Sequence, residues 1–372
     1  MLSYTQTKNA PRYKNCLWRF DMIIERKQYL NELIKKKNNG RIKIITGVRR
    51  CGKSTLFEIY KESKNWGRLV GVSSVGELND LILSGEVKDY VEISEIKQNN
   101  TLAQIANEVL QRKTVKVILI AGPSSSGKTT TAKKLSMQLK VLGINPVVIS
   151  LDDFYLGKDK APRDEKGNPD FECLYALDVE LLNKLLLELM EGKTVEMPSY
   201  DFKESRRREV GKPLSISSND ILILEGIHGL NDELTYKLPK DRKFKIYLSA
   251  LTQLNLDDHN RIPSSDNRLL RRIVRDAKFR GTNADHTIAM WKNVRKGEAK
   301  YIFPFQGTAD AMFNTALDYE LSVLKIYAEP LLKGVKPTDK GYNEASRLLT
   351  FLNNFSPMPS SFVHGQSILR EF

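Results

Sequence analysis

The strongest constraint on the fold of this chain is a glycine-rich loop between an apolar run and a helical pattern. The apolar run, residues 115–121, is typical of a buried strand, and the loop follows as Gly122-Pro123-Ser124-Ser125-Ser126-Gly127-Lys128-Thr129-Thr130. This run fits G-x-x-x-x-G-K-[ST], in which glycines let the backbone curl so that successive N–H groups face phosphate oxygens. The helix that follows adds the positive end of its dipole. We therefore predict that residues 122–130, the main loop, bind a nucleotide; the alternative is a Gly/Ser-rich turn.

Within such a loop the chemistry of two side chains is defined. Lys128 is expected to reach the β- and γ-phosphates, and the Thr129 hydroxyl is expected to bind Mg²⁺. Two later apolar runs, 147–151 and 221–224, are each followed by a carboxylate, Asp152 and Glu225. Open α/β sheets place their ligands at the carboxyl ends of the strands. The sequence thus predicts an α/β, three-layer P-loop fold with a mostly parallel sheet and a helical N-terminal extension.

A predicted helix over 266–280 is rich in arginine. Arg268, Arg271, Arg272 and Arg275 lie at i, i+3, i+4 and i+7 and therefore share one face. Four cations on one face repel one another unless anions meet them, and a triphosphate is the obvious anion. A nucleic-acid face or a solvated surface is the alternative.

Several runs, taken in order, resemble the uridine kinase / phosphoribulokinase family. They are the main loop, Asp152-Asp153-Phe154-Tyr155, Tyr200-Asp201-Phe202, Leu224-Glu225-Gly226-Ile227 and Arg271-Arg272-Ile273-Val274-Arg275-Asp276. The chain is most similar to the bacterial nucleoside kinases that carry an N-terminal TGS-type region, over about residues 57–372. The TGS-type region itself has no counterpart here.

The resemblance implies a kinase that moves the γ-phosphate of ATP (or GTP) to the 5′-hydroxyl of uridine or cytidine, with Mg²⁺. It implies that Asp152 accepts the hydroxyl proton and lies near Mg²⁺, and that Glu225 is the strand carboxylate associated with the metal. The nucleoside side would comprise Tyr155, Glu172 and Tyr200, with the acid on the ribose hydroxyls. Arg272, Arg275 and Arg280 would close on the phosphates. The chain has Ser205 where uridine kinases often carry a histidine that helps to select the pyrimidine, which leaves base specificity open.

A second loop of the same pattern lies near the N-terminus: Gly47-Val48-Arg49-Arg50-Cys51-Gly52-Lys53-Ser54-Thr55. With the helical pattern before it, it resembles the opening of AAA-type ATPases over about residues 22–57. The polar, mostly helical residues 61–111 that follow give no clear strand ending in carboxylates. We interpret this loop as an orphan; an ATPase run from Lys53 is the alternative.

The charge distribution singles out the same N-terminal region. The chain has a net charge of +14, and residues 1–62 hold 15 Lys/Arg and 5 Asp/Glu. Such a basic segment can contact nucleic acid, and a non-catalytic nucleotide- or nucleic-acid-binding protein is therefore an alternative function. A solvated or disordered segment is the favoured explanation of the charge. Another alternative is a kinase of a different small hydroxyl substrate.

The remaining features indicate a cytoplasmic protein. No run of about 18 apolar residues could span a membrane, and the N-terminus lacks the apolar segment of a secretion signal. Three widely spaced cysteines indicate reduced thiols. A homo-oligomer remains open. We divide the chain into a basic leader (1–56), a helical lead-in (57–112), a kinase domain (113–335) and a C-terminal helix with an extended tail (336–372).

Overall fold

The computed structural model describes residues 66–67, 69–163, 167, 169–201, 204, 206–208, 210–257 and 260–372. The second loop at 47–55 and the ATPase-like segment lie outside these residues, as do Phe202 and Ser205. At the centre is a five-stranded sheet in the order β2-β7-β1-β8-β9, in which every pairing is parallel. Its strands are β1 (Val117–Ala121), β2 (Asn145–Ser150), β7 (Asp220–Glu225), β8 (Lys243–Ser249) and β9 (Ala311–Asn314). The predicted α/β fold with a mostly parallel sheet is confirmed.

The register of the sheet brings the ends of three strands level. Ser150 on β2 and Ile120 on β1 both pair with Glu225 on β7. The carboxyl ends of these strands therefore meet at one edge, and the main loop leaves β1 at that edge. This is how residues about a hundred positions apart in sequence come to surround one loop.

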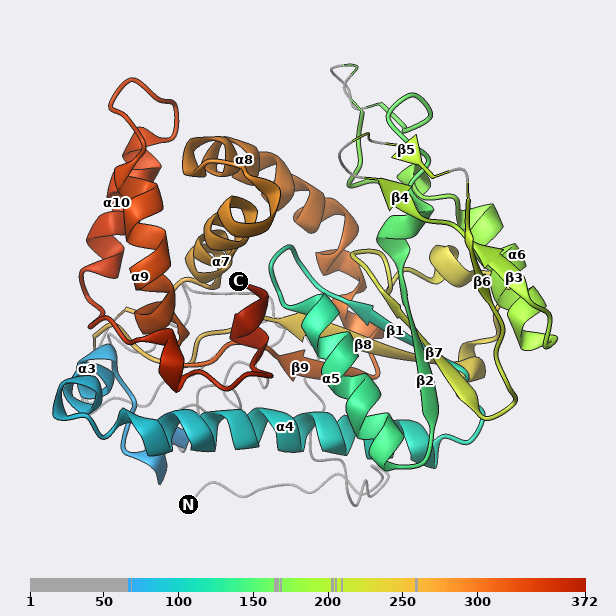
Figure 1. Cartoon of the computed structure of the whole chain (residues 1–372), viewed down its shortest axis with the longest axis horizontal. Helices are drawn as coiled ribbons and strands as arrows, with labels where there is room; N and C mark the ends of the chain where they lie inside the picture. Colours follow the sequence, from blue (N-terminus) through green and yellow to red (C-terminus); the bar gives the residue numbers. More distant parts are fainter. Residues whose placement is uncertain are drawn as a thin grey trace, which may run out of the picture.

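The two faces of the sheet are covered by different helices, as expected for strands buried on both sides. On one face Ile118 and Ile120 belong to a core shared with α4 (Val87–Gln111) and α5 (Lys128–Val141). On the other face Val117 and Leu119 pack with α6 (Val179–Met190). The alternation of side chains along β1 thus builds the three layers (Figure 1).

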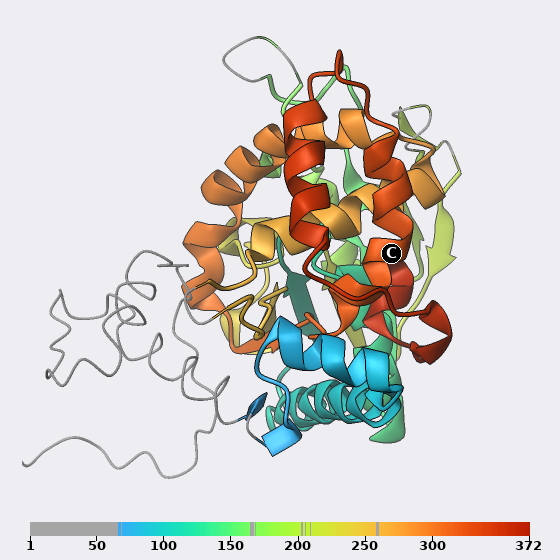
Figure 2. The same cartoon turned by 90° about the vertical axis from the view of Figure 1, so that its left-hand side faces the viewer.

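A group of helices stands beyond the carboxyl edge of the sheet. Figures 1 and 2 show this group above the strands, with α3 (Val75–Ser84) at the opposite end beside α4. The group comprises α7 (Ser264–Arg280), α8 (Ala284–Tyr301), α9 (Glu320–Lys333) and α10 (Tyr342–Leu352). Because buried residues of α7, α9 and α10 belong to the same core as α4 and α5, the group is fixed to the sheet.

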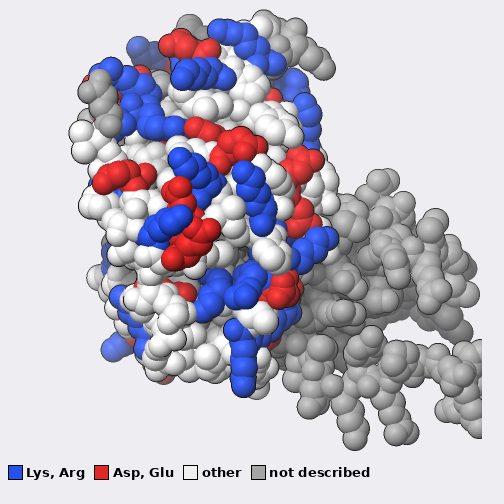
Figure 3. Space-filling model, turned by 90° about the vertical axis from the view of Figure 1, so that its right-hand side faces the viewer, with Lys and Arg blue, Asp and Glu red and all other residues white. Residues whose placement is uncertain are grey.

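Four short strands extend the α6 side. They form the antiparallel pairs β3–β6 and β4–β5, with the bounds β3 (Val195–Met197), β4 (Tyr200–Asp201), β5 (Arg206–Arg207) and β6 (Lys212–Leu214). The side view of this part of the molecule shows Lys and Arg interspersed with Asp and Glu (Figure 3). The face in view therefore carries no field of a single sign.

One sequence expectation near the C-terminus is wrong. Residues 316–355 form two helices, α9 and α10, with Gly334, Pro337 and Gly341 in the turn between them. The tail, expected to be extended, folds back in two short 3₁₀ turns, Ser360–Phe362 and Ile368–Glu371. Its apolar side chains explain this: they enter the core that α5 and α7 share.

Candidate active site

The main loop has the backbone that the glycine pattern requires. Gly127, the residue before α5, has φ +79°, and Ser125 also lies in the left-handed region at φ +57°. A Cβ at Gly122 would lie 2.7 Å from the carbonyl oxygen of Leu248, so only glycine fits there. The loop therefore curls tightly into α5, whose first amides have no carbonyl partners within the helix.

Lys128 lies across the main loop. Its Nζ donates to the carbonyl oxygens of Gly122 at 3.1 Å and Pro123 at 3.3 Å. Burial lowers the pKa of Lys128, while the carboxylates of Glu225, Asp152 and Glu371 act in the opposite direction. The ammonium group is thus held by carbonyls alone over the loop, close to three carboxylates.

The predicted metal ligands lie together. Thr129 Oγ1 and Ser150 Oγ are each 3.2 Å from Oε1 of Glu225. Burial, and next Asp152, raise the pKa of Glu225. Hydroxyl and carboxylate oxygens are what Mg²⁺ prefers, and it commonly takes one or two carboxylates together with substrate phosphates. The part of the chain that the structure describes holds no group of three or more His, Cys, Asp or Glu suited to a metal. These residues fit Mg²⁺.

Asp152 lies two residues beyond the end of β2. It lies in a 3₁₀ turn, Leu151–Phe154, whose first amides are capped by Ser150 Oγ, 3.4 Å from the Asp152 nitrogen. The residue is exposed to solvent. The surrounding protein raises the pKa of Asp152 by desolvation, and the cations Lys128 and Arg280 act against that rise. A carboxylate so placed is suited to hold a hydroxyl group and accept its proton.

The predicted nucleoside residues form an aromatic wall and an acidic position. The ring centroids of Tyr155 and Tyr200 are 5.7 Å apart, and Tyr155 Oη donates to the carbonyl of Phe171 at 3.1 Å. Glu172 follows Phe171 and packs against Gly297 of α8, where a Cβ would come within 2.8 Å of its side chain. Burial, and then the nearby charge of Glu298, raise the pKa of Glu172 to about 7.

Three of the predicted arginines gather around one acid. Asp276 is 3% exposed and lies 3.2 Å from Nε of Arg272, 3.5 Å from Nε of Arg275 and 3.3 Å from Nη1 of Arg280. Arg272 also donates to Ser124 Oγ of the main loop at 2.7 Å. Desolvation lowers the pKa of Arg275, and the charge of Arg280 lowers it further. This cluster carries more positive charge than Asp276 neutralises, as an anion site requires.

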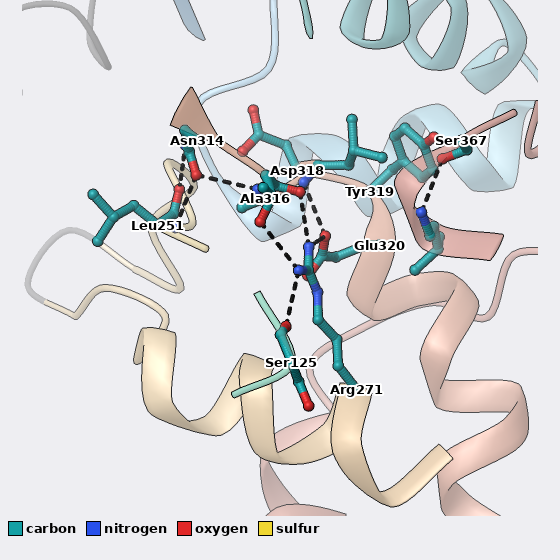
Figure 4. A network of polar contacts seen from close by, with 12 residues as sticks. Ser125, Leu251, Arg271, Asn314, Ala316, Asp318, Tyr319, Glu320 and Ser367 are labelled. Atoms are coloured by element: carbon teal, nitrogen blue, oxygen red, sulfur yellow. Dashed lines mark hydrogen bonds and ion pairs between the residues drawn. The ribbon is translucent and has the colours of Figure 1, made fainter. Parts of the chain in front are cut away.

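The prediction that a triphosphate meets the other two arginines of this face is wrong. Arg271 is fully buried and forms a two-point ion pair with Glu320, at 2.9 and 2.5 Å, and it also donates to the Thr315 carbonyl at 2.8 Å (Figure 4). Arg268 forms a two-point ion pair of the same kind with Glu298. Both arginines also donate to carbonyls of the main loop, those of Ser125 and Ser124. Arg268 and Arg271 therefore support the main loop, and their charges are already neutralised by buried glutamates.

Sequence reasoning missed the acids that complete the site. Glu298 and Glu320 are fully buried, and Glu371 Oε2 accepts a hydrogen bond from the Thr130 amide at 3.2 Å. The signal for the first two was the excess of arginines on one helix face. Nothing in the local sequence pattern indicates which acidic residue forms an ion pair with each arginine.

Comparisons with known proteins identify a family for this chain. Residues 117–322 match the model of the Phosphoribulokinase / Uridine kinase family. The uridine kinase of Brevibacillus brevis is 32% identical over 53% of this chain and 83% of its own length. The uridine kinase of Macrococcus caseolyticus is 32% identical over 52% and 85%. That of Saccharomyces cerevisiae is 30% identical over 65% of this chain and 46% of its own length. Among the described residues, no helix is long and apolar enough to cross a membrane.

Proposed function

Because the chain belongs to the phosphoribulokinase / uridine kinase family and is a phosphotransferase with an alcohol acceptor, we propose that it transfers the γ-phosphate of ATP to the 5′-hydroxyl of uridine or cytidine. One observation supports this most directly. Three carboxylates, Asp152, Glu172 and Glu225, surround the main loop closely enough for each to act on the pKa of Lys128 or be shifted by its charge. In this assignment Glu225 serves the metal, Asp152 the reacting hydroxyl and Glu172 the ribose hydroxyls.

We assign the donor to the main loop. The first-turn amides of α5 and Lys128 would bind its phosphates. Thr129 and Glu225 would hold Mg²⁺, with Asp152 nearby; when bound, the ion neutralises charge on the phosphates. Arg272, Arg275 and Arg280 would bind the phosphoryl oxygens, where charge develops during transfer.

In the proposed reaction, the oxygen of the 5′-hydroxyl forms a bond to the γ-phosphorus as the bond to the bridging oxygen of ADP breaks. The hydroxyl proton passes to Asp152. A carboxylate suffices for this because the proton leaves late and positioning contributes most of the rate. ADP and the nucleoside 5′-monophosphate are the products.

We assign the nucleoside to the side of the cleft that Tyr155 and Tyr200 form. Stacking on an aromatic side chain accommodates any base, so these two tyrosines do not by themselves select uridine or cytidine. Glu172 is one methylene longer than the aspartate that uridine kinases have at the matching position, and it would accept hydrogen bonds from the ribose hydroxyls. It does so best as a carboxylate.

The test is phosphate transfer from γ-labelled ATP to a panel of nucleosides, sugar phosphates and pantothenate, with GTP as the second donor. We expect labelled uridine or cytidine 5′-monophosphate. Transfer to a sugar phosphate alone would favour the phosphoribulokinase-like alternative. ATP binding without transfer to any acceptor would favour a non-catalytic nucleotide-binding protein, and the proposal would then be abandoned.

A further inference from the structure

The last described residues, 367–372, fold over the main loop; we term them the strap. Its 3₁₀ turn begins at Ile368, whose side chain is fully buried. A Cβ at Gly127 would lie 2.7 Å from Cγ2 of Ile368, so the strap packs directly on the residue that starts α5. In Figures 1 and 2 the C-terminal end of the chain lies beside α5 and below α7.

The strap is also fixed to the arginine helix. The ring of Phe372 lies 4.9 Å from the guanidinium carbon of Arg271, and Lys278 Nζ donates to the main-chain oxygen of Phe372 at 3.3 Å. Ser367 caps the turn through the Leu369 amide, 3.2 Å from its Oγ. Anchors on both sides thus determine where the one acidic side chain between them lies.

That side chain, Glu371, binds an amide in the first turn of α5. Its Oε2 accepts from the amide of Thr130, the third residue of α5. This amide is one of the first-turn donors that the helix itself leaves without a partner, the same donors that bind phosphate in a loop of this kind. The negative charge of Glu371 also acts to raise the pKa of Lys128 and that of Arg275, two groups that we assign to the donor.

We propose that Glu371 mimics a donor phosphate: the strap covers the start of α5 in the free enzyme, and Glu371 must leave the Thr130 amide before the donor binds. This rests on the proposed function in one respect, the assignment of the donor to the main loop. Two anions cannot share one amide donor, so the donor competes with the strap. Glu371 therefore sets the affinity for the donor nucleotide, because only molecules with the strap withdrawn are competent to bind.

The test is calorimetric titration of the full chain with ATP, ADP and adenosine at fixed Mg²⁺ without acceptor. Glu371→Gln removes the charge and keeps an acceptor, and we expect it to tighten ATP and ADP binding about two- to fivefold, the range for one charge at a helix N-terminus. Adenosine carries no phosphate, so its affinity should not change. The matched control is Glu92→Gln, which removes an exposed carboxylate from α4. Unchanged or weaker ATP binding in Glu371→Gln would overturn the proposal.

Two further variants separate the possible failures. Glu371→Asp keeps the charge but shortens the side chain, and a smaller gain in ATP affinity is expected; it also provides the reading if Glu371→Gln does not fold. Lys128→Ala should lose ATP binding. If Lys128→Ala binds ATP like the natural chain, the main loop is not the donor site and the proposed function fails. If only the Glu371 variants behave like the natural chain, the strap proposal alone fails.

Discussion

Arg268 and Glu298 form a buried ion pair that contacts both main-chain polar groups of Ser124 in the main loop. The ion pair has two contacts, and in one of them Arg268 Nη2 lies 2.8 Å from Glu298 Oε2. Arg268 Nη1 donates to the Ser124 carbonyl at 3.1 Å, and Glu298 Oε1 accepts from the Ser124 amide at 3.1 Å. Helices α7 and α8 therefore hold the shape of the main loop through one residue.

Glu298→Gln should be strongly destabilising. It leaves the guanidinium of Arg268 buried without its counter-charge, which typically costs about 3–5 kcal/mol. Urea unfolding followed by fluorescence measures the free energy of unfolding. The control is Glu344→Gln, which breaks the exposed pair with Arg347 and should cost at most about 1 kcal/mol. Equal losses in the two variants would contradict a structural role for the buried pair.

Lys128→Ala should abolish phosphate transfer, because it removes the cation that lies over the main loop. Lys53→Ala, the equivalent change in the second loop at 47–55, should leave turnover unchanged. Both are measured with the labelled-ATP assay on the full chain. Loss of transfer in Lys53→Ala alone would mean that the second loop holds the donor.

Asp152→Asn should lower kcat about 10²- to 10⁴-fold, the usual contribution of a positioned general base. The KM for ATP should change little, since Asp152 follows β2 and makes no bond to the main loop. Asp153→Asn is the matched control, because Asp153 Oδ1 instead accepts from the Tyr200 amide at 3.1 Å. If the Asp153 variant loses as much kcat as the Asp152 variant, the base has been wrongly assigned.

Glu225→Gln should raise the Mg²⁺ concentration needed for half-maximal activity. The amide keeps the hydrogen bonds to Thr129 and Ser150 but removes the charge that would attract the ion. The measurement is initial rate against free Mg²⁺ at saturating ATP. An unchanged half-saturation value would exclude Glu225 from the metal site.

Glu172→Gln should make the protein more stable above pH 7 and have little effect near pH 4.5. The pKa of Glu172 is raised from 4.5 to about 7 by burial and by Glu298, so the native state binds more protons than the unfolded state between these values. Stability from this group is present at low pH and falls as pH rises through 7, by up to about 3 kcal/mol. Thermal unfolding at pH 5 and pH 8 tests the sign, with Glu92→Gln as control. A variant less stable at pH 8 than the natural chain would contradict it.

The same carboxyl links stability to the proposed binding of ribose. Since the ionised form accepts hydrogen bonds best, the KM for the nucleoside should rise as pH falls below 7. Initial rates against nucleoside concentration between pH 6 and 8 measure this, and Glu172→Gln should remove the dependence. A KM that stays constant across this range would separate Glu172 from the ribose.

The sequence by itself determined the sheet, the main loop and the carboxylates at its edge. These follow from local patterns: apolar runs form strands, G-x-x-x-x-G-K-[ST] curls the backbone, and parallel strands bring Asp152 and Glu225 to one edge. Helical spacing also correctly placed Arg268, Arg271, Arg272 and Arg275 on α7. The second loop at 47–55, which has the same local pattern, lies outside the described residues, and its role stays a prediction.

Only the tertiary structure decided what each of these arginines meets. Arg271 forms an ion pair with Glu320, which is 49 residues away in the sequence. The Thr130 amide likewise donates to Glu371, which is 241 residues away. A helical pattern states which side chains share a face, but how α7 lies against α8, α9 and the strap determines which anion each one reaches. Burial makes each of these ion pairs necessary, since a buried guanidinium without a nearby carboxylate is strongly unfavourable. Arg268 and Arg271 are paired with buried glutamates, while Arg272 and Arg275 gather at Asp276. This division of one arginine face is therefore a property of the packing.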